Sequence, residues 1–475
     1  PLWMLFMTEF WERFAFYGMR WALTLYVVAQ FYQGSGAGEK PANLIYGAYL
    51  ALVYAGAIFG GYIADRVIGY QRSILVGAVV MSAGLFLIAI PNQDIFRLGL
   101  ATVVVGNGLF KPNISTMVGK LYTVGDERRD SGFTIFYMGI NAGALVAPWL
   151  TGLLATSVFG SDAMPAYKAV FIASGVGMLI SFVWFWFGRR GLGDIGRPLK
   201  GAAGYGRVAM VVLAMLVAIP VVYFLLSIAA ATLQWVLILL FLGPAAMLLI
   251  EGMRIGTVAR DKVIAMLIIF AFNVLFWMFF EQAGSSFNFL AEKIVNRQFG
   301  SWEFPVAWFQ TINSIAIIAL APVLAWIWVR MRSANPSIPR KFGLGLIFNA
   351  LAFLLLMVAL RDMVDTHGKI PFWTLTMVYV LQSVGELCLS PIGLSMVTKL
   401  APERLVGFAM GAWFLSIAIG DNLSGIFASA VSGEGGMTTA SAQHGYTFGW
   451  WILAGFGALL FLIAPLVNKL MHGVK

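Results

Sequence analysis

The sequence predicts an all-α polytopic membrane protein, and its composition, its long apolar runs and its charge distribution each point to that class. Of the 475 residues, 60% are hydrophobic and 11% are charged, whereas a soluble domain has about 25% charged residues. The 52 glycines and 38 phenylalanines are spread along the whole chain, which argues against a soluble body with one membrane anchor. A soluble globular enzyme therefore does not fit this composition.

Fourteen apolar runs approach or exceed the roughly 20 residues that a membrane-spanning helix needs. They lie at about 2–32, 42–65, 73–91, 95–119, 131–157, 167–188, 208–229, 232–250, 263–291, 304–329, 342–360, 371–398, 405–431 and 446–468. The longest polar connection, Gly188 to Arg207, follows the sixth run and predicts a linker between two halves. Two runs with few polar residues come next, and we expect this hairpin to pack outside the core.

The order of six, two and six runs fits the major facilitator fold, which has two six-helix bundles and here a two-helix insertion. We predict an N-terminal bundle at 1–190, a linker with the inserted hairpin at 191–260, and a C-terminal bundle at 261–475. Many secondary transporters are built from such paired repeats, with a binding site near the middle of the membrane.

The net charge of +10 is explained by topology and not by nucleic-acid binding. Alternate connections hold 21 Lys and Arg on one side of the membrane and seven on the other, and three more lie inside helices. The positive-inside bias places the richer side, with both termini, in the cytoplasm. The first run is long and charged, so we expect no cleavable signal peptide, and a start without Met indicates trimming.

Seven ionisable residues are predicted at membrane depth, where each costs about 2.5 to 3.5 kcal/mol. They are Glu9, Glu12, Arg13, Arg20, Lys111, Glu281 and Glu386. Asp421 is a possible eighth, for which a structural role is the better interpretation. Four acids and three bases nearly neutralise one another, which favours a shared polar pathway.

The first helix carries Glu9, Arg13 and Arg20 on one face, with Glu12 about 60° to one side. Because two acids share one base, one of the acids becomes a candidate proton acceptor. A snorkelling cluster at the inner helix end is the alternative, although it explains Arg20 poorly.

Two ion pairs are predicted to join the halves and act as gates. Lys111 is followed by Pro112, and Glu386 precedes Pro391 by five residues, so both charges lie where a helix can bend. Equivalent positions in the two halves pair Lys111 with Glu386 and Arg20 with Glu281. Static interhelical contacts are the alternative.

Amide and aromatic residues accompany these charges. On the seventh core helix they are expected to share one face with Glu281, and the set there is Asn273, Trp277, Gly284 and Asn288. Asn141, Asn313 and Trp413 lie in other runs. Each Asn or Trp taken singly is explained as well by helix packing. One cysteine, Cys388, and three scattered histidines leave almost no ligands for a metal or haem site.

Several motifs resemble those of the proton-dependent oligopeptide transporter family, a branch of the major facilitator superfamily. The first is Glu9-Phe-Trp-Glu12-Arg13-Phe-Ala-Phe16-Tyr17-Gly18, which is similar to the family's ExxERFxYYG. The others are Gly61-Tyr-Ile-Ala-Asp65-Arg66 with Gly69, Phe136-Tyr137-Met-Gly-Ile-Asn141-Ala-Gly143, Glu281-Gln282, and Gly385-Glu386 with Ser390-Pro391. The resemblance covers about residues 3 to 465. Phe16 departs from it, because the family usually has Tyr there.

The resemblance implies residue roles as well as a function. Glu9, Glu12 and Arg13 would couple protons, with Glu281 pairing to Arg20 and included in that set. Arg20 and Lys111 would meet the peptide carboxylate, and Glu386 would meet the amino group with Asn141 and Asn313. Side-chain pockets would be lined by Tyr17, Tyr54, Trp277 and Trp413.

The sequence thus predicts a multi-pass transporter of the cytoplasmic membrane that imports di- and tripeptides with protons by alternating access. Protons are the coupling ion, no other cofactor or metal is expected, membrane lipid is the surrounding partner, and the chain is expected to work as a monomer. A relative that moves nitrate or another small anion is the alternative, which Arg20 and Lys111 would satisfy but Glu9, Glu12 and Glu386 would not explain. A channel filter or hydrolase motif is not evident.

Overall fold

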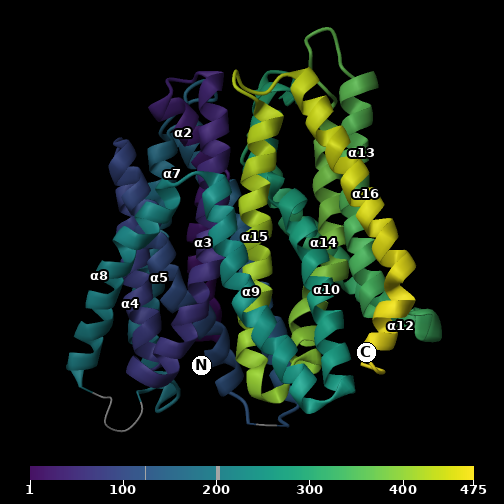
Figure 1. The fold of residues 1–475 in the computed structure, drawn as a ribbon. Coiled ribbons are helices and arrows are strands. Elements are labelled where there is room, and N and C mark those ends of the chain that lie inside the picture. The colour runs from purple at the N-terminus through teal and green to yellow at the C-terminus, as the bar shows by residue number, and fades with distance from the viewer. Residues whose placement is uncertain (124, 199–203, 475) are drawn as a thin grey trace. The chain divides into compact units, whose positions relative to one another are not determined.

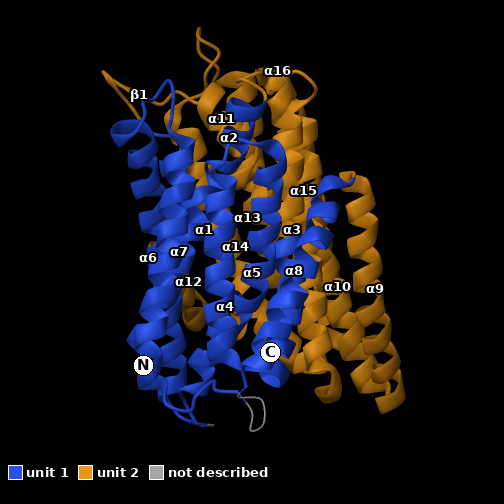
Figure 2. Cartoon of the chain, turned by 90° about the vertical axis from the view of Figure 1, so that its left-hand side faces the viewer, with its two compact units in different colours: residues 1–31, 52–228, 305–314 blue, residues 32–51, 229–304, 315–475 orange. Residues whose placement is uncertain are grey.

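The computed structural model describes residues 1–123, 125–198 and 204–474, and it divides the chain into two compact units, coloured in Figure 2. Unit 1 comprises Pro1–Phe31, Leu52–Ile228 and Pro305–Ser314, and unit 2 comprises Tyr32–Ala51, Ala229–Phe304 and Ile315–Lys475. Parts of three predicted basic connections, at 124, 199–203 and 475, lie outside the described residues. Two helices, α3 Glu39–Ile63 and α12 Trp308–Met331, contribute to both units. The predicted boundaries 1–190, 191–260 and 261–475 stay a prediction.

Unit 1 consists mainly of long helices (Figure 1). They are α1 Leu2–Arg20, α2 Leu23–Phe31, the second part of α3 Glu39–Ile63, α4 Tyr70–Ile88, α5 Gln93–Lys120, α6 Arg128–Leu153, α7 Tyr167–Gly188, α8 Tyr205–Ser227 and the first part of α12. Short π-helical turns at Ala64–Ile68 and Leu154–Val158 extend α3 and α6, and a 3₁₀ turn at Arg189–Leu192 extends α7. Within this unit α1 packs against α6 and α7, and α4 packs against α5 and α7.

Unit 2 contains the remaining helices and one small antiparallel hairpin. Its elements are the first part of α3, α9 Ala230–Ile255, α10 Thr257–Phe280, α11 Ser286–Lys293, β1 Gln298–Phe299, β2 Trp302–Glu303, most of α12 Trp308–Met331, α13 Ile338–Asp362, α14 Phe372–Leu400, α15 Val406–Ser432 and α16 Thr439–Leu470. Short 3₁₀ turns lie at Gly36–Gly38, Glu281–Gly284, Arg332–Ala334 and Glu403–Leu405. Helices α13 and α16 lie side by side (Figure 1).

Twelve helical segments of the described chain are long and apolar enough to cross a membrane. The two predicted spans that are missing from this group coincide with α1–α2 and with α5. Both are helical, and α5 has 28 residues, or about 42 Å at 1.5 Å per residue. Their hydropathy is lowered by the internal charges of the predicted pathway, Glu9, Glu12, Arg13 and Arg20 on α1 and Lys111 on α5.

Two of the predicted continuous helices are interrupted, which corrects the sequence interpretation. The span 2–32 breaks after Arg20, where a turn at Trp21–Ala22 separates α1 from α2. The span 263–291 breaks at Glu281, where a 3₁₀ turn separates α10 from α11. The single helical face predicted for Asn273, Trp277, Glu281, Gly284 and Asn288 is therefore wrong beyond the end of α10. Apolar composition continues through both breaks, so hydropathy alone did not reveal them.

The inserted hairpin contributes one helix to each unit. Helix α8 packs against α5 in unit 1, where Val211 and Met215 join Leu109 and Ile68 in an apolar cluster. Helix α9 packs against α10 and α15 in unit 2. The side-chain amide of Asn422 on α15 donates to the Ala230 carbonyl and to Gln234 Oε1 of α9, both at 3.0 Å.

Helices α3 and α5 approach to backbone contact at a pair of glycines in unit 1. A Cβ atom added at Gly60 would lie 1.6 Å from the carbonyl oxygen of Gly108, and one added at Gly108 would lie 2.9 Å from the carbonyl oxygen of Gly56. The Asn113 side chain donates to the Gly60 carbonyl at 3.2 Å, which fixes the same contact. This close approach sets the spacing of the two helices that carry Tyr54 and Lys111.

We expect Gly60→Ala to lower the thermal unfolding midpoint of the purified protein, because the added methyl group must push α3 and α5 apart. Overpacking of this kind costs about 1 to 3 kcal/mol. The neighbouring Gly61 provides the matched control, since no heavy atom lies within 4 Å of a Cβ placed there. Equal midpoints for Gly60→Ala and Gly61→Ala would contradict the close approach.

Candidate functional site

Glu9, Glu12 and Arg13 on α1 form one buried ionic cluster in unit 1. The Arg13 guanidinium donates to both carboxylate oxygens of Glu12, at 2.5 Å from Nε and 2.7 Å from Nη2. Its Nε lies 3.6 Å from Glu9 Oε1, and Glu9 Oε2 has no hydrogen-bond partner among the described residues. All three residues are less than 5% exposed. The two acids therefore share one base unequally, and Glu12 takes the larger share.

Neighbouring helices enclose this cluster. A Cβ atom at Gly143 of α6 would lie 2.9 Å from the Cβ of Arg13, so α6 runs directly against the arginine. From α5, the buried Asn107 amide reaches Glu12 Oε1 at 3.5 Å. Sequence reasoning missed Asn107, although a polar residue in the apolar run 95–119 was the available signal.

Aromatic rings lie between the two arginines of α1. The Arg13 guanidinium carbon is 4.7 Å from the centre of the Phe16 ring and 5.5 Å from that of Tyr17, and the Arg20 guanidinium carbon is 5.7 Å from the Tyr17 ring. At these distances the ring faces attract the cations. Phe16 therefore keeps a cation–π contact with Arg13 although it has no hydroxyl group.

On α5, Lys111 packs against an aromatic ring, as the two arginines of α1 do. Its Nζ lies 5.1 Å from the centre of the Tyr54 ring of α3, across the glycine contact described above. The other two predicted polar residues of this unit, Asn141 on α6 and Asn313 on α12, are half-buried. The Asn141 amide donates to the Tyr137 carbonyl one turn earlier at 3.1 Å. Unit 1 thus gathers the acid cluster, Arg20, Lys111, Tyr17 and Tyr54.

In unit 2, Trp277 is held by a hydrogen-bond chain that links α10 to α15. Its indole N–H donates to Asn273 Oδ1 at 3.0 Å, and the Asn273 amide donates to Ser416 Oγ at 2.9 Å. Trp413 is 3% exposed, and its ring centre lies 5.6 Å from that of Phe270. Both tryptophans are buried, and the hydrogen-bond chain fixes the orientation of Trp277.

Glu281 begins the 3₁₀ turn that interrupts the path from α10 to α11, and it is buried. Side chains bond to backbone carbonyls beside the break: the Gln282 amide donates to the Met278 carbonyl at 3.0 Å, and the Asn288 amide donates to the Gly284 carbonyl at 3.1 Å. The Gln282 amide also donates to the Ser424 carbonyl of α15 at 3.1 Å. Glu386 lies inside α14, half-buried, before Pro391. Unit 2 therefore carries two of the predicted acids, one of them at a break in the helical path.

The predicted gate pairs, Arg20 with Glu281 and Lys111 with Glu386, each take one residue from each unit. They stay predictions. Among the described residues, no group of three or more His, Cys, Asp or Glu side chains could hold a metal ion.

Residues 71–441 match the model of the POT family. The chain belongs to the POT family. It is 34% identical to the peptide transporter YePEPT of Yersinia enterocolitica over 91% of this chain and 88% of that protein. It is also 32% identical to dipeptide and tripeptide permease B of Aeromonas hydrophila, over 99% and 94%.

A solved structure of a peptide transporter POT in complex with sulfate shares the fold. Its TM-score is 0.84 at 35% identity, and the match covers 99% of this chain and 96% of that one. The predicted family and the all-α polytopic membrane fold are thereby confirmed.

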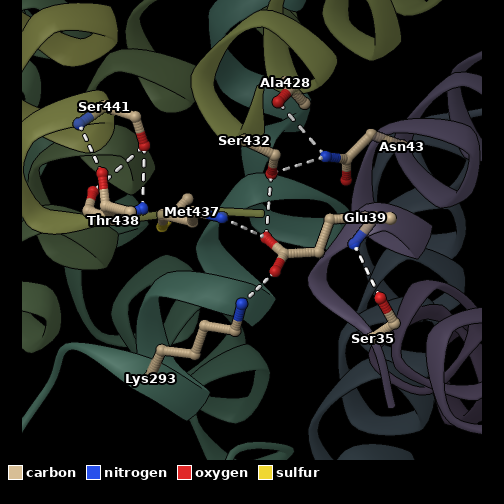
Figure 3. A network of polar contacts seen from close by, with 10 residues as sticks. Ser35, Glu39, Asn43, Lys293, Ala428, Ser432, Met437, Thr438 and Ser441 are labelled. Carbon is tan, nitrogen blue, oxygen red and sulfur yellow. Dashed lines mark hydrogen bonds and ion pairs between the residues drawn. The ribbon is translucent and has the colours of Figure 1, made fainter. Parts of the chain in front are cut away.

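In this POT-family chain, the first turn of α3 carries a buried carboxylate that sequence reasoning missed (Figure 3). Glu39 is fully buried and forms an ion pair with Lys293 at the end of α11. It also accepts hydrogen bonds from Ser432 Oγ and from the Met437 backbone N–H, both at 3.0 Å. One turn later, Asn43 donates to Ser432 Oγ and to the Ala428 carbonyl, both at 3.2 Å.

The loop after α15 is shaped to receive this carboxylate. Gly436 has φ +95°, a conformation that side chains rarely adopt, and a Cβ there would lie 2.7 Å from Glu39 Oε2. The adjacent Lys40–Glu434 pair is exposed, with Nζ 2.7 Å from Oε1, and it holds the pKa of the Glu434 carboxyl below its usual value. The α3 start is therefore fixed to α11, α15 and the following loop inside unit 2.

We expect Lys293→Ala to destabilise the purified protein, because it leaves the Glu39 carboxylate buried without its cation. Removing one partner of a buried pair typically costs about 3 to 5 kcal/mol, and the remaining bonds from Ser432 and Met437 keep the loss toward the lower end. Thermal unfolding in detergent measures the effect. Lys40→Ala is the control, since exposed pairs contribute at most about 1 kcal/mol.

The double variant Glu39→Gln with Lys293→Ala should recover part of the lost stability, because the unpaired charge is removed. A Lys293→Ala midpoint equal to that of Lys40→Ala would show that the ion pair contributes little.

Proposed function

We propose that this chain is a proton-coupled symporter that imports di- and tripeptides across the cytoplasmic membrane by alternating access. The observation that carries the proton coupling is the unequal sharing of Arg13 by Glu9 and Glu12. Glu12 has two short bonds from the guanidinium, whereas Glu9 has one longer contact and one oxygen without a hydrogen bond. A proton on Glu9 would remove a charge that is poorly compensated in a buried place, so Glu9 is the proposed proton carrier.

The peptide assignment is supported by the relatives named above and by the chemistry of the buried charges. A short peptide is a zwitterion, so a binding protein needs fixed cations for its carboxylate and an anion for its amino group. Arg20 and Lys111 in unit 1 are the proposed carboxylate ligands. Glu386 is the proposed amino-group ligand, with Asn141 and Asn313 as additional hydrogen-bond partners.

Aromatic surface would accommodate peptide side chains of different shapes. Tyr17 and Tyr54 are already oriented by Arg20 and Lys111 through cation–π contacts, so the same cations would fix both the peptide backbone and the pocket walls. Trp277 and Trp413 are the proposed aromatic residues of unit 2. Large aromatic faces give contact area without demanding one side-chain chemistry, which suits a transporter of many peptides.

The remaining proposals concern coupling, orientation and assembly. Arg20–Glu281 and Lys111–Glu386 are the proposed gate pairs, formed and broken as the transporter changes state. The richer set of 21 basic residues in alternate connections supports cytoplasmic termini. Protons are the proposed coupling ion without a further cofactor, and the proposed working unit is the monomer.

Uptake of labelled dialanine into proteoliposomes tests the function. We expect accumulation that requires an inward proton gradient and that collapses when an ionophore removes the gradient. Nitrate is the parallel substrate and should not accumulate. Dialanine flux that ignores the gradient, or nitrate flux in its place, would overturn the proposal.

The proton assignment leads to a separate expectation for Glu9→Gln. Gradient-driven dialanine accumulation should be lost, because the amide cannot take up a proton, while exchange of labelled for unlabelled peptide across the membrane should continue. The exposed acid Glu127 in a connection provides the control Glu127→Gln. Unchanged accumulation by Glu9→Gln would move the proton-carrying role to another acid.

A further inference from the structure

An apolar groove runs along the exposed side of α7 in unit 1. Its volume is about 630 Å³, and its walls include Val176, Ile180, Val183, Trp184 and Phe187 of α7 with Met4 of α1. The α7 residues follow the i, i+4, i+7, i+8 and i+11 pattern of one helical face, so they form one continuous stripe of the helix. At Gly188 an added Cβ would lie 2.2 Å from Met4 Cγ, so the absence of a side chain lets Met4 close this end of the groove.

Two arginines follow the closed end of the groove. Arg189 and Arg190 begin the 3₁₀ turn after α7, and the Arg189 guanidinium carbon lies 3.8 Å from the centre of the Trp186 ring. Neither arginine forms an ion pair within the described part of the chain, while Arg190 is exposed. Trp184 and Trp186 are of the type that marks the membrane–water boundary, which puts both cations at headgroup level.

The length of the groove matches one leaflet of a bilayer. From Val176 to Gly188 the helix rises about 18 Å, and half of the hydrocarbon thickness is about 15 Å. The apolar groove is about as long as one leaflet is thick, and it ends at two cations. It is therefore complementary to a molecule with an acyl tail and an anionic head.

We propose that this groove binds an anionic phospholipid, with an acyl chain along α7 and the phosphate at Arg189 and Arg190. Basic positions next to membrane helices attract acidic headgroups in this way. The site rests on unit 1 alone and does not depend on which solute the protein carries.

Three substitutions separate the two parts of the site. Arg189→Gln with Arg190→Gln removes the cations proposed to bind the headgroup. Val183→Trp fills the groove from an exposed position. Arg330→Gln is the matched control, because Arg330 also lies over an exposed tryptophan, Trp326, at the basic end of a helix but outside the groove.

Native mass spectrometry of the detergent-purified protein measures retention of phosphatidylglycerol and of phosphatidylcholine with the same acyl chains. The wild type should retain phosphatidylglycerol more tightly. The double arginine variant should weaken phosphatidylglycerol binding by about thirtyfold, at about 1 kcal/mol for each arginine, and leave phosphatidylcholine nearly unchanged. Val183→Trp should weaken both lipids, and Arg330→Gln neither.

Several results would overturn the proposal. They are equal retention of both lipids by the wild type, phosphatidylglycerol binding that survives the double arginine variant, and an equal loss in Arg330→Gln. Displacement of phosphatidylglycerol by inorganic phosphate would assign the cations to a free anion. A dimer that Val183→Trp dissociates would assign the groove to a second copy of the chain.

Discussion

The ion pairs of the Arg13 guanidinium with the carboxylates of Glu9 and Glu12 are the interaction on which the unit 1 part of the candidate site depends. Charges at membrane depth persist only when they are paired or functional. Placing acids four and one residues from the arginine lets a single helix supply its own counterions, so the cluster can form before any other helix is in place. Asn107 of α5 and the close approach of α6 at Gly143 then pack against the cluster.

Glycine at helix crossings determines where the other charges lie. Without a hydrophobic driving force between helices in lipid, close backbone packing is a major source of association. Gly60 and Gly108 bring α3 and α5 to contact, and Tyr54 on one helix consequently reaches Lys111 on the other. The glycine contact that stabilises unit 1 therefore also positions Lys111. A substitution at Gly60 or Gly108 would change both the stability of the unit and the geometry of the site.

Hydropathy and charge patterns predicted most of the helices and their order along the chain. The charged residues predicted inside helices include Glu9, Glu12, Arg13, Arg20 and Glu281, and these are buried. Single motifs such as the one around Glu9, Glu12 and Arg13 depend on spacing within one helix, which the sequence contains directly. The interruption at Glu281 was missed because apolar residues continue through it, and the side chain of the adjacent Gln282 bonds to Ser424, which lies far along the chain. The Glu39–Lys293 pair was missed for the same reason: its partners are 254 residues apart.

The net charge of the Glu9, Glu12 and Arg13 cluster relates it to the proposed proton-driven transport. Two carboxylates and one guanidinium leave one negative charge, which the proton of the proposed mechanism would cancel. A zwitterionic peptide adds no net charge, and the proton's charge is then the quantity that the membrane potential acts on. One charge crossing 100 mV releases about 2.3 kcal/mol, and one pH unit adds about 1.4 kcal/mol. Together these correspond to an accumulation of roughly several hundredfold, which one titratable site is enough to support. Glu12 is bound on both oxygens and holds Arg13 in position, so in the proposed mechanism Glu9 is the acid of this cluster that changes its charge.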